Sequence, residues 1–156
     1  MPETTPAFAS RDTVLGQSGL AFMEGIRDGR LPPPPISRVL NYRVTDVSEG
    51  RVVFVGTPLP DHCNPLGTVH GGWYGTLLDS AMSCAVHTTV PQGQVYTTLE
   101  YKVNVTRSIP VGLEVAVEGL VQHAGRTTGV ANGWIRGVAD GKTYATGSAT
   151  CLIMAG

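Results

Sequence analysis

The sequence has few charged residues and few cysteines. Charged residues make up 15% of the chain and the formal net charge is −1, so there is no basic field for nucleic acid. The three cysteines, Cys63, Cys84 and Cys151, form no CxxC pair, which argues against a disulfide framework and predicts free thiols in a reducing cytosol. The low charge also predicts that part of the surface is buried in a homo-oligomer.

Targeting and membrane segments are missing as well. The first ten residues contain Glu3 and no apolar core, so they do not form a signal peptide. No apolar run approaches the length of about 18 residues that a membrane span needs. We expect a cytoplasmic protein, because free thiols fit a reducing cytosol and neither a signal peptide nor a membrane span is predicted. A length of 156 residues can bury one core without disulfide or metal support.

The N-terminal part differs in pattern from the rest. Apolar spacing predicts a helix over residues 12–28, although three glycines weaken it. Pro32 to Pro35 cannot continue that helix and favour an extended link. We therefore divide the chain into residues 1–37, an N-terminal tail, helix and proline-rich link packed on the domain, and residues 38–156, the main domain.

The main domain alternates in the way that strands do. A hairpin is predicted from Arg38 to Thr57, with its turn at Glu49-Gly50. Valine and threonine enrichment predicts four later strands, over residues 95–107, 114–123, 127–138 and 143–153. Because no βαβ alternation recurs, an antiparallel sheet is favoured over a parallel one.

One mostly apolar stretch, residues 64–87, interrupts these strands and carries a single acid. Asp79 is the only charged residue between Trp73 and Val86. A carboxylate in such a helix is costly to bury unless it is partnered or used. A helix that is apolar nearly all round must also be covered nearly all round, so we expect a strongly curved sheet to wrap it.

The pattern Asn64-x-x-Gly67-x-x-His70-Gly71-Gly72, followed by Asp79, resembles the signature of the hotdog-fold acyl-CoA thioesterases. It is most similar to the branch of the phenylacetate-pathway and 4-hydroxybenzoyl-CoA thioesterases. Similar residues stand at 98–104 and 125–127, and the resemblance covers roughly residues 38 to 154. It implies an α+β hotdog fold, which is a curved antiparallel β-sheet wrapped around a long central α-helix, here with an extra N-terminal helix.

Two groups fit the hydrolysis of a thioester. The unpaired N–H groups at a helix N-terminus can hold an oxyanion, and glycine at 71 and 72 lets a substrate approach the backbone. The alternative is that both glycines serve tight packing; the resemblance favours the Gly71 N–H as the donor. Asp79 can act as general base on water or as nucleophile, or it can be a buried structural acid.

The spacing of these two groups has a consequence. Asp79 lies eight residues beyond Gly71, or about 12 Å along a helix at about 1.5 Å per residue. One thioester carbon cannot easily touch both. An antiparallel partner helix would place Gly71 of one chain opposite Asp79 of the other, so that a twofold dimer holds two composite sites. The resemblance agrees with sites built across a dimer, and we expect that dimer to pair into a tetramer.

Four further residues are expected to support the reaction, each with a structural alternative. Asn64 would orient water or the thioester, unless it caps its own loop. His70 would brace that loop or bond near the carbonyl, unless it only serves the helix entry. Ser83, one turn after Asp79, would orient water or the acid, unless it merely allows helix contact. Thr98 resembles a hydroxyl that places the water, with a slip to Thr97 left open.

The remaining assignments concern binding. Residues expected to line the acyl pocket, or to belong to the core instead, are Gly72, Trp73, Met82 and Tyr101. Arginines that could contact the CoA phosphates are Arg107 and Arg126. His62, Cys63 and His70 suggest a thiol nucleophile or a zinc site, but no orienting residue or fourth ligand accompanies them. We expect neither a metal nor a cofactor, because CoA is part of the substrate.

The sequence therefore predicts a thioesterase that cleaves an acyl- or aryl-CoA to the free acid and CoA. The alternative is a non-catalytic acyl-CoA or lipid-binding protein with the same pocket and oligomer. Asp79 together with the intact His70-Gly71-Gly72 favours an enzyme. A hotdog dehydratase would carry a different Asp/His arrangement, and no such motif is present.

Overall fold

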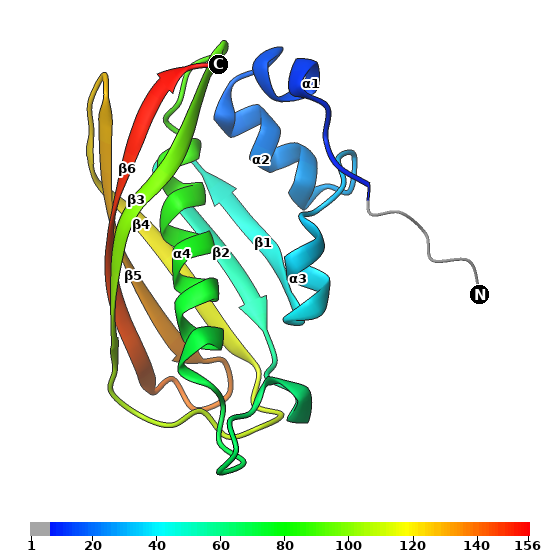
Figure 1. Ribbon diagram of the computed structural model, residues 1–156, viewed down its shortest axis with the longest axis vertical. Coiled ribbons are helices and arrows are strands. Elements are labelled where there is room, and N and C mark those ends of the chain that lie inside the picture. The colour runs from blue at the N-terminus through cyan, green and yellow to red at the C-terminus, as the bar shows by residue number, and fades with distance from the viewer. Residues whose placement is uncertain (1–6) are drawn as a thin grey trace.

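The computed structural model describes residues 7–156, in which one long helix lies against a curved antiparallel sheet (Figure 1). The helix is α4, Gly71–His87. The sheet has six strands in the order β1-β2-β4-β5-β6-β3. Their bounds are β1 Tyr42–Ser48, β2 Arg51–Gly56, β3 Gln94–Val105, β4 Val115–Ala124, β5 Thr128–Gly137 and β6 Thr143–Ala155. This is the predicted hotdog arrangement, with β1 and β3 at the sheet edges.

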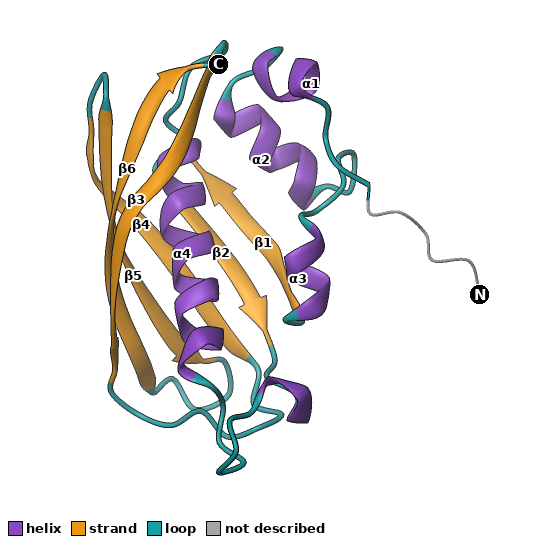
Figure 2. Cartoon of the chain, in the orientation of Figure 1, coloured by secondary structure: helices purple, strands orange, loops and turns teal. Residues whose placement is uncertain are grey.

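The N-terminal segment forms a layer of short helices beside β1, and this layer reaches the C-terminal end of α4 (Figures 1 and 2). They are α1 Arg11–Leu15, α2 Gly19–Arg27 and α3 Pro35–Val39. The expected helix over residues 12–28 is present in two pieces, because the Ser18 hydroxyl accepts a hydrogen bond from the Ala21 N–H and starts a second helix. Gly19 of α2 lies against the carbonyl of His87, which anchors this layer to α4.

One predicted boundary is wrong. The strand expected from Arg38 begins at Tyr42, because residues 35–39 form α3 instead. Pro35 stands at the first helical position, where its missing N–H costs nothing and its fixed φ suits a helix. Asn41, at φ 56°, then reverses the chain into β1. The short helix η1, Pro60–His62, precedes the loop that leads into α4.

A row of three paired glycines brings α4 close to the sheet. Gly119 pairs with Gly133, and Gly133 pairs with Gly147, across β4, β5 and β6. A Cβ at Gly119 would lie 2.1 Å from the Ala81 carbonyl oxygen, and one at Gly133 would lie 2.9 Å from Cγ of Met82. Glycine in a strand interior often marks such a close approach. The row therefore fixes the depth at which α4, and Asp79 with it, sits against the sheet.

Candidate active site

The N-terminus of α4 offers one free backbone donor. The Gly72 N–H donates to Nδ1 of His70 at 2.8 Å, and the Trp73 N–H donates to the His70 carbonyl at 2.9 Å. Within residues 7–156, the exposed Gly71 N–H has no acceptor. A Cβ at Gly71 would meet nothing within 4 Å, so the packing of this chain does not require glycine there. The donor is thus open to a ligand or to a second chain.

The loop before α4 is braced by two of the predicted residues. The side-chain oxygen Oδ1 of Asn64 accepts hydrogen bonds from the N–H groups of Leu66 and Thr68, and the side-chain Nδ2–H donates to the Thr68 hydroxyl at 2.8 Å. His70 is the N-cap of α4. Both side chains hold the loop that presents Gly71, which is the structural alternative considered for each of them. A direct contact of either with substrate stays a prediction.

Asp79 is half-buried in the middle of α4 and is held by one hydroxyl. The Thr98 Oγ1 donates to Asp79 Oδ1 at 3.0 Å, the only hydrogen bond to this carboxylate among the described residues. Burial raises the pKa of Asp79 above its usual value, and the Thr98 hydrogen bond acts in the opposite direction. The carboxylate therefore has an acceptor oxygen to spare and a basicity suited to receiving a proton.

The geometry of β3 explains why Thr98 reaches the acid. A bulge between Thr98 and Glu100 inserts Leu99 as an extra residue, opposite the pair Thr150 and Cys151 of β6. As a result Thr98 and Tyr101 both face α4, and the Tyr101 ring lies over Gly75. Bulges re-aim side chains in this way near functional sites. The seam between α4 and the edge strand β3 thus gathers small and polar groups around Asp79.

Ser83 and His87 continue this seam toward the C-terminus of α4. Both side chains are buried. The His87 ring packs between Phe22 and Tyr96, with ring centroids 5.3 and 4.9 Å away. Burial lowers the pKa of His87 to about 4, so this imidazole is neutral at physiological pH. Ser83 stands one turn from Asp79, and its assistance to the acid stays a prediction.

The predicted binding residues fall into three places. Trp73 and Met82 lie in the core, where the Trp73 Nε1–H donates to the Leu40 carbonyl at 2.9 Å. Arg107 lines a surface hollow of about 340 Å³ together with Gly71, at the N-terminal end of α4. Arg126 lies in the β4–β5 turn, at the opposite end of the sheet. Contact of any of them with a substrate stays a prediction, as it does for Gly72 and Tyr101.

Gly71 and Asp79 do not share one carbonyl within this chain. The helix is continuous from Gly71 to His87, so the two groups remain separated by about 12 Å at about 1.5 Å per residue. The hydrogen-bonded acid and the free donor therefore occupy different parts of the same helix, as two half-sites would.

The rival chemistry around His62 does not assemble. Nδ1 of His62 accepts from the Leu59 N–H at 3.0 Å, and Nε2 lies 2.8 Å from the Val39 carbonyl. Both ring nitrogens are thus used by the fold, and His62 is not free to activate Cys63. No group of three His, Cys, Asp or Glu side chains among residues 7–156 could hold a metal ion. Over the same residues, no helix is long and apolar enough to cross a membrane.

The residues that sequence reasoning missed lie beside Asp79. Ser80 donates to or accepts from the Tyr42 hydroxyl at 2.9 Å, and with Cys84 and Tyr96 it faces a cavity under the N-terminal helices. The signal for Tyr96 was available, because it stands two residues before Thr98 and strand side chains alternate between faces. The cavity itself had no signal, since it depends on how the N-terminal layer packs.

Comparisons with known proteins bear on the family and the fold of this chain. A model of the thioesterase superfamily matches residues 66–137, which include Gly71, Asp79 and Thr98. No curated protein matches the sequence. The predicted resemblance to the thioesterase superfamily, in the branch of the phenylacetate-pathway proteins, is confirmed by this match and by the similar solved structures.

Three of those structures define the likeness. A thioesterase family protein from Silicibacter pomeroyi is 27% identical, with a TM-score of 0.76, covering 86% of this chain and 99% of its own. A variant of the phenylacetic acid degradation protein PaaI from Thermus thermophilus is 25% identical, with a TM-score of 0.70, covering 76% and 98%. The smu.793 protein of Streptococcus mutans, bound to acetyl CoA, is 23% identical, with a TM-score of 0.67, covering 74% and 90%. The chain thus has the hotdog fold.

Proposed function

We propose that this protein hydrolyses acyl-CoA thioesters to the free acid and CoA. The observation that carries the proposal is the environment of Asp79. This half-buried acid of α4 has a raised pKa, and its carboxylate accepts one hydrogen bond, from the Thr98 hydroxyl of β3. The match to the thioesterase superfamily supports a thioester as the substrate. The acetyl CoA bound by the Streptococcus mutans protein supports CoA as its thiol half.

The proposed reaction uses Gly71 of one chain and Asp79 of the partner chain. The free Gly71 N–H donates to the thioester oxygen and stabilises the negative charge that develops there. Asp79 of the partner chain takes the proton of a water that attacks the carbonyl carbon, or attacks that carbon itself. The C–S bond then breaks, and CoA leaves as the thiol after taking up a proton. Thr98 orients the carboxylate, while Asn64, His70 and Ser83 hold the surrounding loop and helix.

Release of thiol from a panel of acyl-CoA substrates tests the activity. Asp79→Asn keeps the shape of the side chain and an acceptor for Thr98, and it is expected to lower kcat about 10²- to 10⁴-fold, the range for loss of a general base. The matched control is Asp61→Asn, an exposed acid in η1, which is expected to keep the wild-type rate. A full rate in Asp79→Asn would refute this mechanism. Tight binding of acyl-CoA without turnover by the wild type would instead select a non-catalytic binding protein.

A complementation experiment tests the composite site. Gly71→Pro removes the donor, Asp79→Asn removes the base, and each variant alone is expected to be inactive. Random mixing of the two variants in a twofold dimer gives half heterodimers, each with one intact site of two, so about a quarter of the wild-type activity should return. If both groups act within one chain, every chain carries a defect and no activity returns. Recovery therefore supports the shared site, and its absence refutes it.

Single turnover in H₂¹⁸O tests for a nucleophilic Asp79. Attack by the carboxylate forms a mixed anhydride, and water that opens it at the Asp79 carbonyl puts the label into the protein and one carboxylate oxygen into the product acid. Unlabelled acid and labelled protein after one turnover would therefore identify Asp79 as the nucleophile. With Asp79 as base, the product acid carries solvent oxygen from the first turnover.

A further inference from the structure

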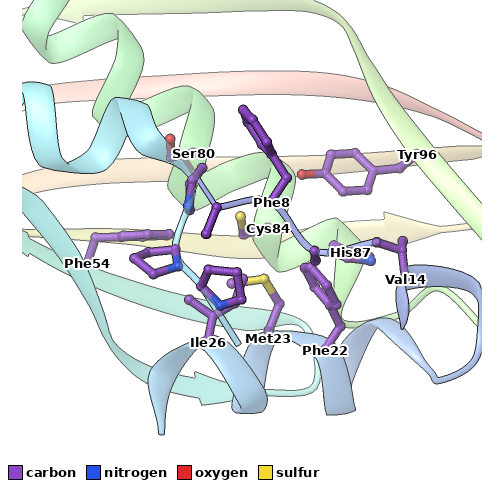
Figure 3. Close-up of a pocket in the computed structure, with 15 residues that line it drawn as sticks. Phe8, Val14, Phe22, Met23, Ile26, Phe54, Ser80, Cys84, His87 and Tyr96 are labelled. Carbon is purple, nitrogen blue, oxygen red and sulfur yellow. The ribbon is translucent and has the colours of Figure 1, made fainter. Parts of the chain in front are cut away.

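An apolar cavity separates the N-terminal layer from α4. Its volume is about 320 Å³, and ten of its fifteen lining residues come from residues 7–34. Figure 3 shows Phe8 over the cavity, Phe22 and Met23 from α2 below it, and Cys84 and His87 from α4 behind them. Tyr96 of β3 points its hydroxyl toward the cavity from the other side. The cavity therefore exists only because the N-terminal layer covers this part of α4.

The lining suits an uncharged ligand. None of the fifteen residues is an acid, a lysine or an arginine. The Ser80 hydroxyl is already paired with Tyr42. Burial raises the pKa of the Cys84 thiol to about 12 and lowers that of His87 to about 4, so both groups are neutral at physiological pH. A charged head group would lose its hydration here with no partner to replace it.

The cavity lies directly beside the proposed catalytic acid. Ser80 follows Asp79 in α4, and Cys84 is one further turn along the same helix. On the strand opposite, Tyr96 and Thr98 share one face of β3, and Thr98 binds Asp79. A thioester carbonyl at Asp79 would thus have an apolar chamber within reach of its acyl group. The family match at residues 66–137 does not include residues 7–34, so this wall is supplied by a part of the chain outside the matched region.

We propose that this chamber holds the acyl group of the substrate, and that residues 7–34 set its length. The inference rests on the proposed thioesterase activity and names its substrate class, an apolar acyl group of medium length. At about 30 Å³ for each water-sized group, the volume of about 320 Å³ corresponds to roughly ten or eleven carbon atoms. Charged acyl groups are excluded, because the lining holds no charged side chain to replace their hydration.

Chain-length profiles test this assignment. Wild-type kcat/KM is expected to rise about fourfold for each added methylene, the value for burying one such group, and to level off at roughly ten or eleven carbons. Ala9→Trp fills the chamber from the half-buried N-terminal segment. It should lower kcat/KM for octanoyl-CoA at least tenfold and leave acetyl-CoA within about twofold. The matched control is Ala139→Trp, at an exposed turn, which should keep the wild-type profile.

A second variant tests the same wall in case the large side chain of Ala9→Trp disturbs folding. Phe8 is 73% exposed, so Phe8→Ala removes one wall without touching the core. It should lower kcat/KM for octanoyl-CoA several-fold and leave acetyl-CoA unchanged. Unchanged chain-length profiles in both Ala9→Trp and Phe8→Ala would overturn the assignment.

Binding without turnover separates the chamber from the proposed activity. Calorimetry with octanoyl-CoA and the Asp79→Asn protein is expected to show affinity that a combined Ala9→Trp change reduces at least tenfold. That reduction supports the chamber even if no acyl-CoA is hydrolysed by the wild type, an outcome that would refute the thioesterase alone. Equal affinity in the two proteins refutes the chamber whatever the wild type hydrolyses.

Discussion

Replacing Gly71 with proline would remove one N–H and disturb little else. Gly71 is the first residue of α4, a position that proline favours because its N–H is not used within the helix. His70 has φ −63° and ψ 139°, the extended conformation that a residue before proline prefers. A side chain at position 71 points into open space, since a Cβ there would meet nothing within 4 Å. The His70 cap on Gly72 does not involve the removed group.

The expected effects on stability and activity have opposite signs. Proline at a compatible position stabilises by about 0.4–1 kcal/mol, chiefly by restricting the unfolded chain. For a chain of this length that corresponds to a rise in Tm of about 1–4 °C. Loss of one oxyanion donor lowers kcat about 10²- to 10³-fold, or roughly 3–4 kcal/mol of transition-state stabilisation. A more stable protein that is nearly inactive is therefore the predicted result.

Thermal unfolding and thiol release on the same preparation measure both quantities. Gly71→Ala is the companion variant, because it keeps the N–H and adds only a Cβ; a smaller loss of kcat than in Gly71→Pro would assign the difference to the donor. Gly119→Ala is the structural control, and it should be destabilised because its Cβ would collide with the Ala81 carbonyl. Wild-type kcat in a folded Gly71→Pro protein would refute the role of this N–H.

Three further predictions follow from the titrating groups. Burial raises the pKa of Asp79 in the folded chain above the ordinary value of 3.8, so the ionised carboxylate lowers the stability of the fold above pH 3.8. Asp79→Asn should therefore unfold at a higher urea concentration than wild type at pH 7, and this difference should vanish below pH 3.8. Thr98→Val should move the acid limb of the kcat/KM profile to higher pH, because the hydrogen bond that lowers the pKa of Asp79 is lost, while Thr98→Ser should leave the limb in place. His87 takes up a proton below pH 6.5 in the unfolded chain but only below about pH 4 in the folded chain. The free energy of unfolding should therefore fall by about 3 kcal/mol between pH 6.5 and 4. In urea titrations, His87→Gln should make this dependence on pH weaker.

These three predictions fail in different ways. Equal urea midpoints for Asp79→Asn and wild type at pH 7 would mean that burial of the Asp79 charge does not destabilise the fold. Coincident pH profiles for Thr98→Val and wild type would show that the Thr98 hydroxyl does not influence the pKa of Asp79. An unchanged pH slope in His87→Gln would place the acid-sensitive group elsewhere.

Local patterns were enough to predict most of the elements. Alternation located β1 to β6 to within a few residues except at Arg38, where Pro35 starts a helix that a strand pattern conceals. Continuous apolarity around Asp79 predicted α4 and its wrapping sheet. The glycines of the sheet had no such local meaning. Gly119, Gly133 and Gly147 form a row only when the strand register places them side by side.

The sequence by itself determined the separation of Gly71 from Asp79, because the helix rise keeps them apart wherever the helix lies. Only the tertiary structure decided which groups are free to act. It showed that Asn64 braces its own loop and that the Gly72 N–H is capped by His70. It also showed that the Gly71 N–H has no acceptor within residues 7–156, and that Thr98, beside a bulge in β3, binds Asp79. It also placed the N-terminal helices over α4 to form an apolar chamber. Hydrogen-bond partners and cavities depend on contacts between distant segments, which periodicity and motif spacing do not record.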